Sequence, residues 1–235
     1  METIPLYVSV ILALTTVLTG WLFYKASRYS KTVLIILLAW LFIQAVVGLT
    51  GFYQDTSVLP PRFLLAIGPP MLLIVLLFLT RRGRQFIDSL NLETLTFLHI
   101  IRIPVEIVLY FLFLHKGIPE VMTFEGRNLD IISGITAPVI YYLGFVSGKL
   151  WPRTILAWNL ICLALLVNIV TTAILATPYP FQKFGLDQPN VAIFYFPFVW
   201  LPAMIVPVVL LSHLASIRKL IGKKKAVGDI EMAAS

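Results

Sequence analysis

The chain has 235 residues, of which 59% are hydrophobic and 12% are charged, and its mean hydropathy is +0.93. Soluble domains carry about 25% charged residues, so this composition excludes a soluble enzyme, a disordered chain and a nucleic-acid-binding protein. The net charge of +7 instead predicts basic loops beside an anionic membrane leaflet, with membrane lipids as partners. The single cysteine, Cys162, excludes an intrachain disulfide and a cysteine-based metal site.

Seven apolar stretches follow one another along the chain. A membrane-spanning helix needs about 20 predominantly apolar residues, and such stretches occur at about 5–24, 32–53, 63–80, 94–114, 131–146, 154–176 and 191–216. The fifth is the weakest, because Gly134 and Pro138 interrupt it, so six is the alternative count. We predict an all-α integral membrane protein: residues 1–225 form one seven-helix transmembrane domain, and 226–235 form a flexible tail.

The orientation follows from the unequal distribution of basic residues. Thirteen Lys and Arg residues lie at one set of span ends and four at the other, while Arg102 lies inside a span. Because cytoplasmic loops are rich in Lys and Arg, this predicts an extracytoplasmic N-terminus and a cytoplasmic C-terminus in the plasma membrane, the cell inner membrane of a bacterium. The first span follows no basic segment, so it is predicted to be a permanent helix rather than a cleaved signal.

Two halves of the chain share a weak pattern. Residues 38–40 and 156–158 both read Leu-Ala-Trp, and a proline follows each tryptophan after twenty residues, at Pro60 and Pro178. This favours a 3+1+3 parallel repeat around the fourth helix. In helix count and orientation the chain resembles the SWEET and PQ-loop transporters, which include the KDEL receptors. Their Pro-Gln signature is absent from the first and fifth helices here, so the resemblance concerns architecture and not chemistry.

The fourth predicted helix carries polar side chains deep in the membrane. Spacings of three, four and four residues place these on one helical face: His99, Arg102, Glu106 and Tyr110. A charge at the bilayer centre costs about 2.5–3.5 kcal/mol on insertion scales, so this face should point into the protein or a wet cavity. We predict a solute-binding or proton-relay site here, to which the sixth helix adds Asn168. The structural alternative is that Arg102 and Glu106 only neutralise each other.

The loop after this helix is the most polar outer segment. Its charged residues are Glu120, Glu125, Arg127 and Asp130. They are predicted to form a lid over the outer mouth of the cavity. For Asp130, which precedes the fifth helix, an N-cap is the alternative role.

Three functions fit these observations. The favoured one is binding and transport of a small polar or anionic solute, with Arg102 holding an anionic group and Glu106 exchanging protons. The second is a membrane enzyme or redox protein in which His99 and His213 hold a haem or a metal. The third is a ligand receptor or partner subunit. No ligand-pair motif accompanies the histidines, so we expect no catalytic residue, no metal and no cofactor, while an oligomer is compatible with the sequence.

Overall fold

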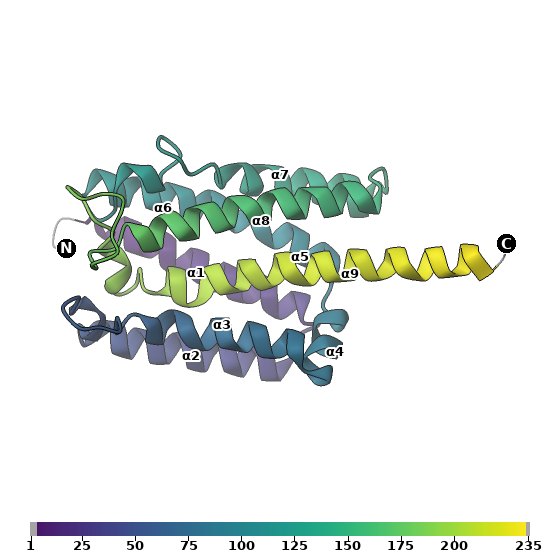
Figure 1. Ribbon diagram of the computed structural model, residues 1–235, viewed down its shortest axis with the longest axis horizontal. Coiled ribbons are helices and arrows are strands. Elements are labelled where there is room, and N and C mark those ends of the chain that lie inside the picture. Colours follow the sequence, from purple (N-terminus) through teal and green to yellow (C-terminus); the bar gives the residue numbers. More distant parts are fainter. Residues whose placement is uncertain (1–3, 234–235) are drawn as a thin grey trace.

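The computed structural model describes residues 4–233, with side chains as far as Gly222. This part of the chain is an all-α bundle, 73% helical and without strands (Figure 1). Its helices are α1 (Leu6–Ala26), α2 (Lys31–Leu49), α3 (Leu64–Leu79), α4 (Arg81–Ser89), α5 (Leu92–Leu98), α6 (Arg102–Leu114), α7 (Ile131–Tyr141), α8 (Pro152–Leu175) and α9 (Val206–Ala233). Short 3-10 or π segments join several of them, notably η2 (His99–Ile101), η4 (Tyr142–Val146) and η6 (Leu201–Ile205).

Five segments are long and apolar enough to cross a membrane. They are Leu6–Ala26, Lys31–Leu49, Leu92–Leu114, Pro152–Leu175 and Leu201–Gly222. A sixth arises if α3 and α4, which meet at 96°, form one broken span. The segment Ile131–Val146 is apolar but shorter, as its glycine and proline predicted. The helical class is therefore confirmed with five or six candidate spans, and the seventh span stays a prediction.

Two predicted span boundaries differ from the ends of the observed helices. The second span was expected to reach residue 53, but α2 ends at Leu49 because the chain turns at Gly51, whose φ of 73° is left-handed. The last span was expected from residue 191, but the long helical segment begins at Leu201 with the π-helical η6, after a 3-10 turn over Ala192–Phe194 and after Pro197, which lacks an N–H to donate. Helix α9 continues to Ala233, while 234–235 lie outside the described residues, so flexibility of the 226–235 tail stays a prediction.

The fourth predicted span is not one regular helix. Helix α5 gives way to the 3-10 turn His99–Ile101 before α6 begins at Arg102. Pro104 explains the change, because it cannot donate a hydrogen bond to the carbonyl of Ile100 and its ring crowds that carbonyl. The tighter turn places His99 and Arg102 side by side on the inner face of the bundle.

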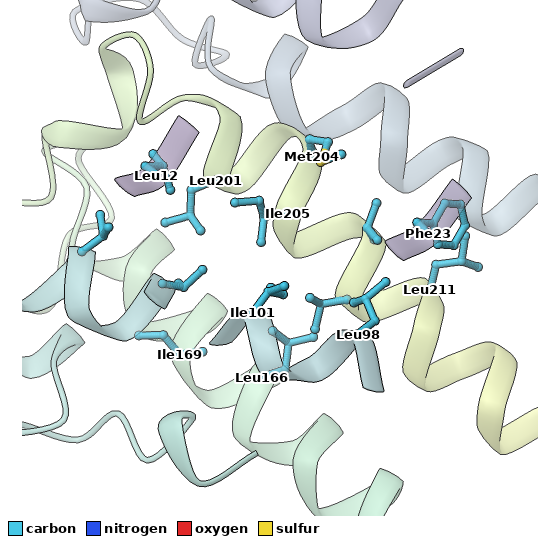
Figure 2. Packing of buried hydrophobic residues seen from close by; sticks show 14 of the residues in the cluster. Leu12, Phe23, Leu98, Ile101, Leu166, Ile169, Leu201, Met204, Ile205 and Leu211 are labelled. Atoms are coloured by element: carbon cyan, nitrogen blue, oxygen red, sulfur yellow. The ribbon is translucent and has the colours of Figure 1, made fainter. Parts of the chain in front are cut away.

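Packing of apolar side chains holds these segments around one core. Figure 2 shows residues from α1, the α5–η2 segment, α8, η6 and α9 meeting there: Leu12, Phe23, Leu98, Ile101, Leu166, Ile169, Leu201, Met204, Ile205 and Leu211. A smaller aromatic cluster closes the N-terminal end of the bundle, where Phe63 packs edge-to-face on Tyr53 and Phe194. The core thus joins the first helix to the last.

Two tryptophans fasten α2 to the start of the last helix. Pro207 has no N–H, so the carbonyl of Ala203 loses its partner within the helix. The indole Nε1 of Trp40 donates to that carbonyl at 2.9 Å, and Trp200 Nε1 donates to the carbonyl of Leu41 at 3.1 Å. These two hydrogen bonds therefore couple the position of α2 to the main-chain conformation of η6.

At the opposite end of the bundle, basic side chains of α9 bind α4 and the residue that follows it. The guanidinium of Arg218 makes two hydrogen bonds to the Asp88 carboxylate, each at 2.9 Å. Lys219 Nζ donates to the backbone carbonyls of Asp88 and Leu90. The hydrogen bonds from Arg218 hold the pKa of Asp88 below its ordinary value of 3.8.

Asp88→Asn should therefore lower stability only where the wild-type carboxyl is ionised. A lowered folded-state pKa gives stability that is present above the ordinary pKa of 3.8 and lost as the pH falls through the folded value. Because the pair is half-exposed, we expect a loss of no more than about 1 kcal/mol in unfolding free energy at pH 7. Unfolding curves against pH check this, with Asp187→Asn in an exposed loop as the control. A difference that persists unchanged in acid would contradict the assignment.

Helix α7 approaches α6 closely at Gly134. A Cβ there would lie 2.9 Å from the backbone nitrogen and from Cγ1 of Ile103, and 3.2 Å from Cβ of Arg102. The nitrogen belongs to the backbone of α6, which cannot move freely, so the contact requires glycine. Gly68 on α3 differs, because a Cβ there would meet nothing within 4 Å.

Gly134→Ala should destabilise the protein by about 1–3 kcal/mol, the usual cost of overpacking a close contact. Gly68→Ala should be neutral or slightly stabilising, since alanine is the better helix former by about 1 kcal/mol. Unfolding of both variants in mixed micelles compares the two directly. Equal effects would mean that α7 does not pack as closely as described.

Candidate functional site

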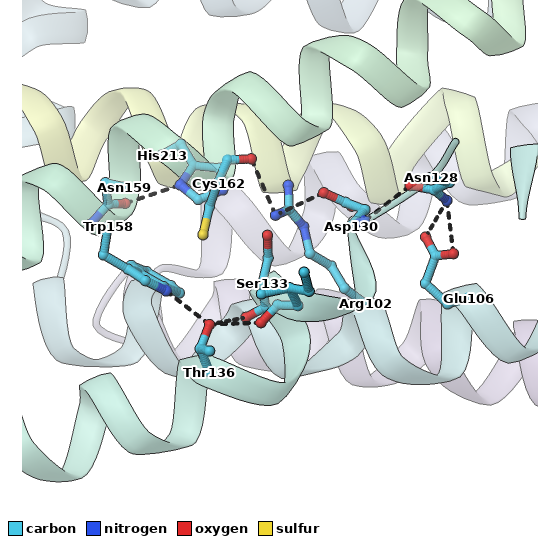
Figure 3. A network of polar contacts seen from close by, with 11 residues as sticks. Arg102, Glu106, Asn128, Asp130, Ser133, Thr136, Trp158, Asn159, Cys162 and His213 are labelled. Carbon is cyan, nitrogen blue, oxygen red and sulfur yellow. Dashed lines mark hydrogen bonds and ion pairs between the residues drawn. The ribbon is translucent and has the colours of Figure 1, made fainter. Parts of the chain in front are cut away.

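Arg102 is the centre of a buried polar network. It begins α6, is 2% exposed, and its Nη1 lies 3.2 Å from Oδ1 of Asp130 (Figure 3). The same nitrogen donates to the backbone carbonyl of Cys162 on α8 at 3.4 Å. The structural alternative, an ion pair between Arg102 and Glu106 along one helix, differs from what is observed: the ion pair of Arg102 crosses from α6 to Asp130 at the start of α7.

Glu106 is held by an asparagine of the loop. Its two carboxylate oxygens accept from Nδ2 of Asn128 at 2.6 and 2.7 Å, and that amide also donates to the Met122 carbonyl at 3.1 Å. The Oδ1 of Asn128 accepts the backbone N–H of Asp130 at 3.0 Å. Asn128 thus connects the Glu106 carboxyl group to the backbone of Asp130. The sequence analysis missed it, since a polar side chain in a polar loop gave no signal beyond a turn.

The predicted lid residues separate into two groups. Asp130, 5% exposed, belongs to the buried network, and its side chain turns to Arg102 instead of capping α7. The other three lie exposed: Glu120, Glu125 and Arg127. Asn168 reaches the same loop from α8, where its Nδ2 donates to the Arg127 carbonyl at 3.1 Å. The loop is therefore tied to the bundle by Asn128, Asp130 and Asn168, and its charged tip faces outward.

The side chain of Tyr110 is not part of the buried polar network. Its ring stacks on Phe124 of the loop, with centroids 5.0 Å apart, one turn beyond Glu106. Of the four residues predicted to share a face of the fourth helix, His99, Arg102 and Glu106 are buried together and Tyr110 supports the loop.

His99 and His213 meet at the inner end of this row. Their rings are stacked, with centroids 3.8 Å apart and planes 15° from parallel, beside Trp158. Asn159 Oδ1 lies 3.0 Å from His213 Nδ1. Both ring nitrogens of His99 and Nε2 of His213 have no hydrogen-bond partner among the described residues.

This stack is a poor metal or haem site. The two rings lie face to face, whereas two imidazoles that bind one metal point a ring nitrogen each at a shared centre. Among the described residues no group of three or more His, Cys, Asp and Glu is placed to hold a metal ion. The donor geometry therefore gives the redox alternative little support.

A cavity of about 390 Å³ lies beside the carboxyl groups. Its walls come from α3, α6, α8, η6 and the start of α9, and most of its lining is aliphatic. The polar residues that line it are Glu106, Asp130, Thr171, Thr177 and Tyr179. Arg102 is absent from this lining, so a molecule in the cavity meets the carboxyl groups and not the guanidinium.

One family model fits this chain: a family described as a domain of unknown function (DUF8737) matches residues 59–221. The match covers more than half of the 235 residues and includes the whole network, so the chain belongs to this family. No curated protein and no solved structure matches the chain significantly.

Breaking the Arg102–Asp130 pair should destabilise the protein strongly. Arg102→Leu leaves a buried carboxylate without its partner, which typically costs about 3–5 kcal/mol. Combining it with Asp130→Asn should recover part of this loss, so a double-mutant cycle on unfolding free energies should give a coupling of about 1–3 kcal/mol. The cycle of Arg102→Leu with Glu106→Gln should give less. If the Glu106 cycle showed the larger coupling, the pairing described above would be incorrect.

Proposed function

We propose that this protein spans the membrane seven times, with an extracytoplasmic N-terminus and a cytoplasmic C-terminus, and binds and transports a small polar solute. The two short segments complete the count. Helix α3 and the Ile131–Val146 segment each have 16 residues, or about 24 Å of helix, which crosses most of a hydrocarbon core of about 30 Å. The orientation is supported by the excess of basic residues at the end where α9 clasps α4.

One observation carries the binding proposal: Glu106 and Asp130, 1% and 5% exposed, are the charged residues that line a mostly aliphatic cavity. Ionisable groups inside a membrane bundle are expensive and by default mark a binding or ion pathway. A carboxyl pair attracts a solute that carries positive charge or donates hydrogen bonds. Because no basic side chain of the described residues lines the cavity, a cation fits better than the anion that the sequence alone suggested.

Transport, as opposed to binding alone, is supported by the two walls that contain prolines. Helix α3 holds Pro69 and Pro70, and η6 holds Pro202 in a π-helical turn. Prolines and π turns remove main-chain hydrogen bonds within the helix and allow it to bend. A cavity between two such elements can change its opening from one side of the bundle to the other, as alternating access requires.

Uptake of tetramethylammonium into vesicles containing the purified protein tests this function. The probe has a permanent positive charge, so it does not cross the bilayer as a neutral base. We expect saturable uptake that falls at least tenfold in Glu106→Gln, which keeps the shape of the side chain. The control is Glu125→Gln, at the exposed tip of the loop, which should behave as wild type.

Each other result has a definite meaning. Binding of the probe without uptake would overturn transport and leave a receptor. Equal uptake by wild type and Glu106→Gln would remove the carboxyl pair from the function altogether.

A further inference from the structure

The cavity is longer and more apolar than a small polar solute requires. Its lining follows α8 from Leu166 to Ile174, about 12 Å along the helix axis at the usual rise, and follows the last helix from Leu201 to Leu210. The volume of about 390 Å³ falls within the range of about 300–1,000 Å³ typical of small-molecule sites. A compact hydrophilic ion would leave most of this aliphatic wall without a partner.

The cavity also reaches the lipid-facing surface of the bundle. Several of its lining residues are exposed, among them Leu64 on α3 by 52%, and Val167 and Ile174 on α8 by 53% and 44%. Between these two helices an apolar chain can pass from the bilayer to the interior along mostly aliphatic side chains.

The charged side chains of the site indicate which chemical group the other end of the ligand carries. The network at the polar end contains two carboxyl groups, Glu106 and Asp130, and one guanidinium, Arg102, which sits behind Asp130. Asn128 gives Glu106 a single amide group as donor, although an ionised carboxylate can accept about four hydrogen bonds. Two carboxyl groups therefore share one guanidinium, and when both are ionised the excess negative charge complements one cationic group.

We propose that the cavity binds a single-chain amphiphile, with its cationic head against Glu106 and Asp130 and its hydrocarbon tail along α3, α8 and the start of α9. This inference rests on the proposed function, because it uses the same carboxyl site and names the class of its ligand. The tail explains the aliphatic walls and the lateral opening. The head explains why two carboxyl groups lie at the end of such a cavity.

The test compares a head with and without a tail. Equilibrium binding of radiolabelled tetramethylammonium and decyltrimethylammonium is measured on the full chain in lipid nanodiscs, with protein-free nanodiscs subtracted. Decanoate supplies the same tail with the opposite charge. Two variants separate the ends of the ligand: Glu106→Gln removes the charge at the head, and Val170→Phe fills the aliphatic part of the cavity, which Val170 lines.

We expect decyltrimethylammonium to bind more tightly than tetramethylammonium and decanoate not to compete. Val170→Phe should weaken the long ligand at least tenfold and change the short one less than twofold, while Glu106→Gln should weaken both at least tenfold. Leu160→Phe, on the exposed face of α8 away from the cavity, is the matched control and should change neither. Thr171→Phe, also in the cavity wall, replaces Val170→Phe if that variant does not fold.

The outcomes distinguish the two proposals. If both probes bind through Glu106 but neither cavity-filling variant affects the long one, the amphiphile is wrong and the carboxyl site stands. If decanoate binds as well as decyltrimethylammonium, the charge assignment is wrong. If no alkylammonium binds in a Glu106-dependent way, this inference and the proposed function both fail.

Discussion

The ion pair between Arg102 and Asp130 is the constraint on which the rest of the site depends. An unpaired charge in so apolar a bundle would be costly, so the start of α7 must lie against the start of α6. Gly134 permits that approach, because any larger residue would meet the backbone of Ile103. The loop between α6 and α7 is therefore held at both ends. Within this loop, Asn128 forms its hydrogen bond to Glu106. One pair thereby fixes two helices, a loop and the orientation of both carboxyl groups.

This arrangement separates the charges by function. The guanidinium lies behind Asp130 and away from the cavity, whereas the carboxyl groups line it. In the proposed site Arg102 is therefore a positioning residue that favours the ionised form of its partner, and among the described residues the only charged side chains that a ligand in the cavity would meet are acidic. Without their positions, the identities of Arg102, Glu106 and Asp130 would be equally compatible with an anionic ligand. Their order in space is what favours a cation.

The features that could be predicted from the sequence are those that lie within a single helix. Hydrophobic length located the apolar segments, and the spacing of His99, Arg102 and Glu106 placed them correctly on one buried face. It could not predict pairing between segments, so Asp130 was assigned to a cap or lid and Asn128 was missed. His213 was considered only as a haem or metal ligand with His99, and its stacking on that ring depends on the 3-10 turn before α6 and on the packing of α9. Helix boundaries failed where Gly51 and Pro197 redirect the chain.

The tryptophan bonds between α2 and the last helix have a consequence for biosynthesis. Trp40 and its acceptor, the carbonyl of Ala203, are 163 residues apart, and Trp200 and Leu41 are 159 apart. In the proposed topology α2 enters the bilayer during translation, before Trp200 and Ala203 have been synthesised, so neither hydrogen bond can yet form. Until the ribosome has produced almost the whole chain, α2 then has its hydrophobicity and its contacts with α1, but not these two bonds. Final closure of the bundle is a late event, and a truncated product would leave α2 without its fastening.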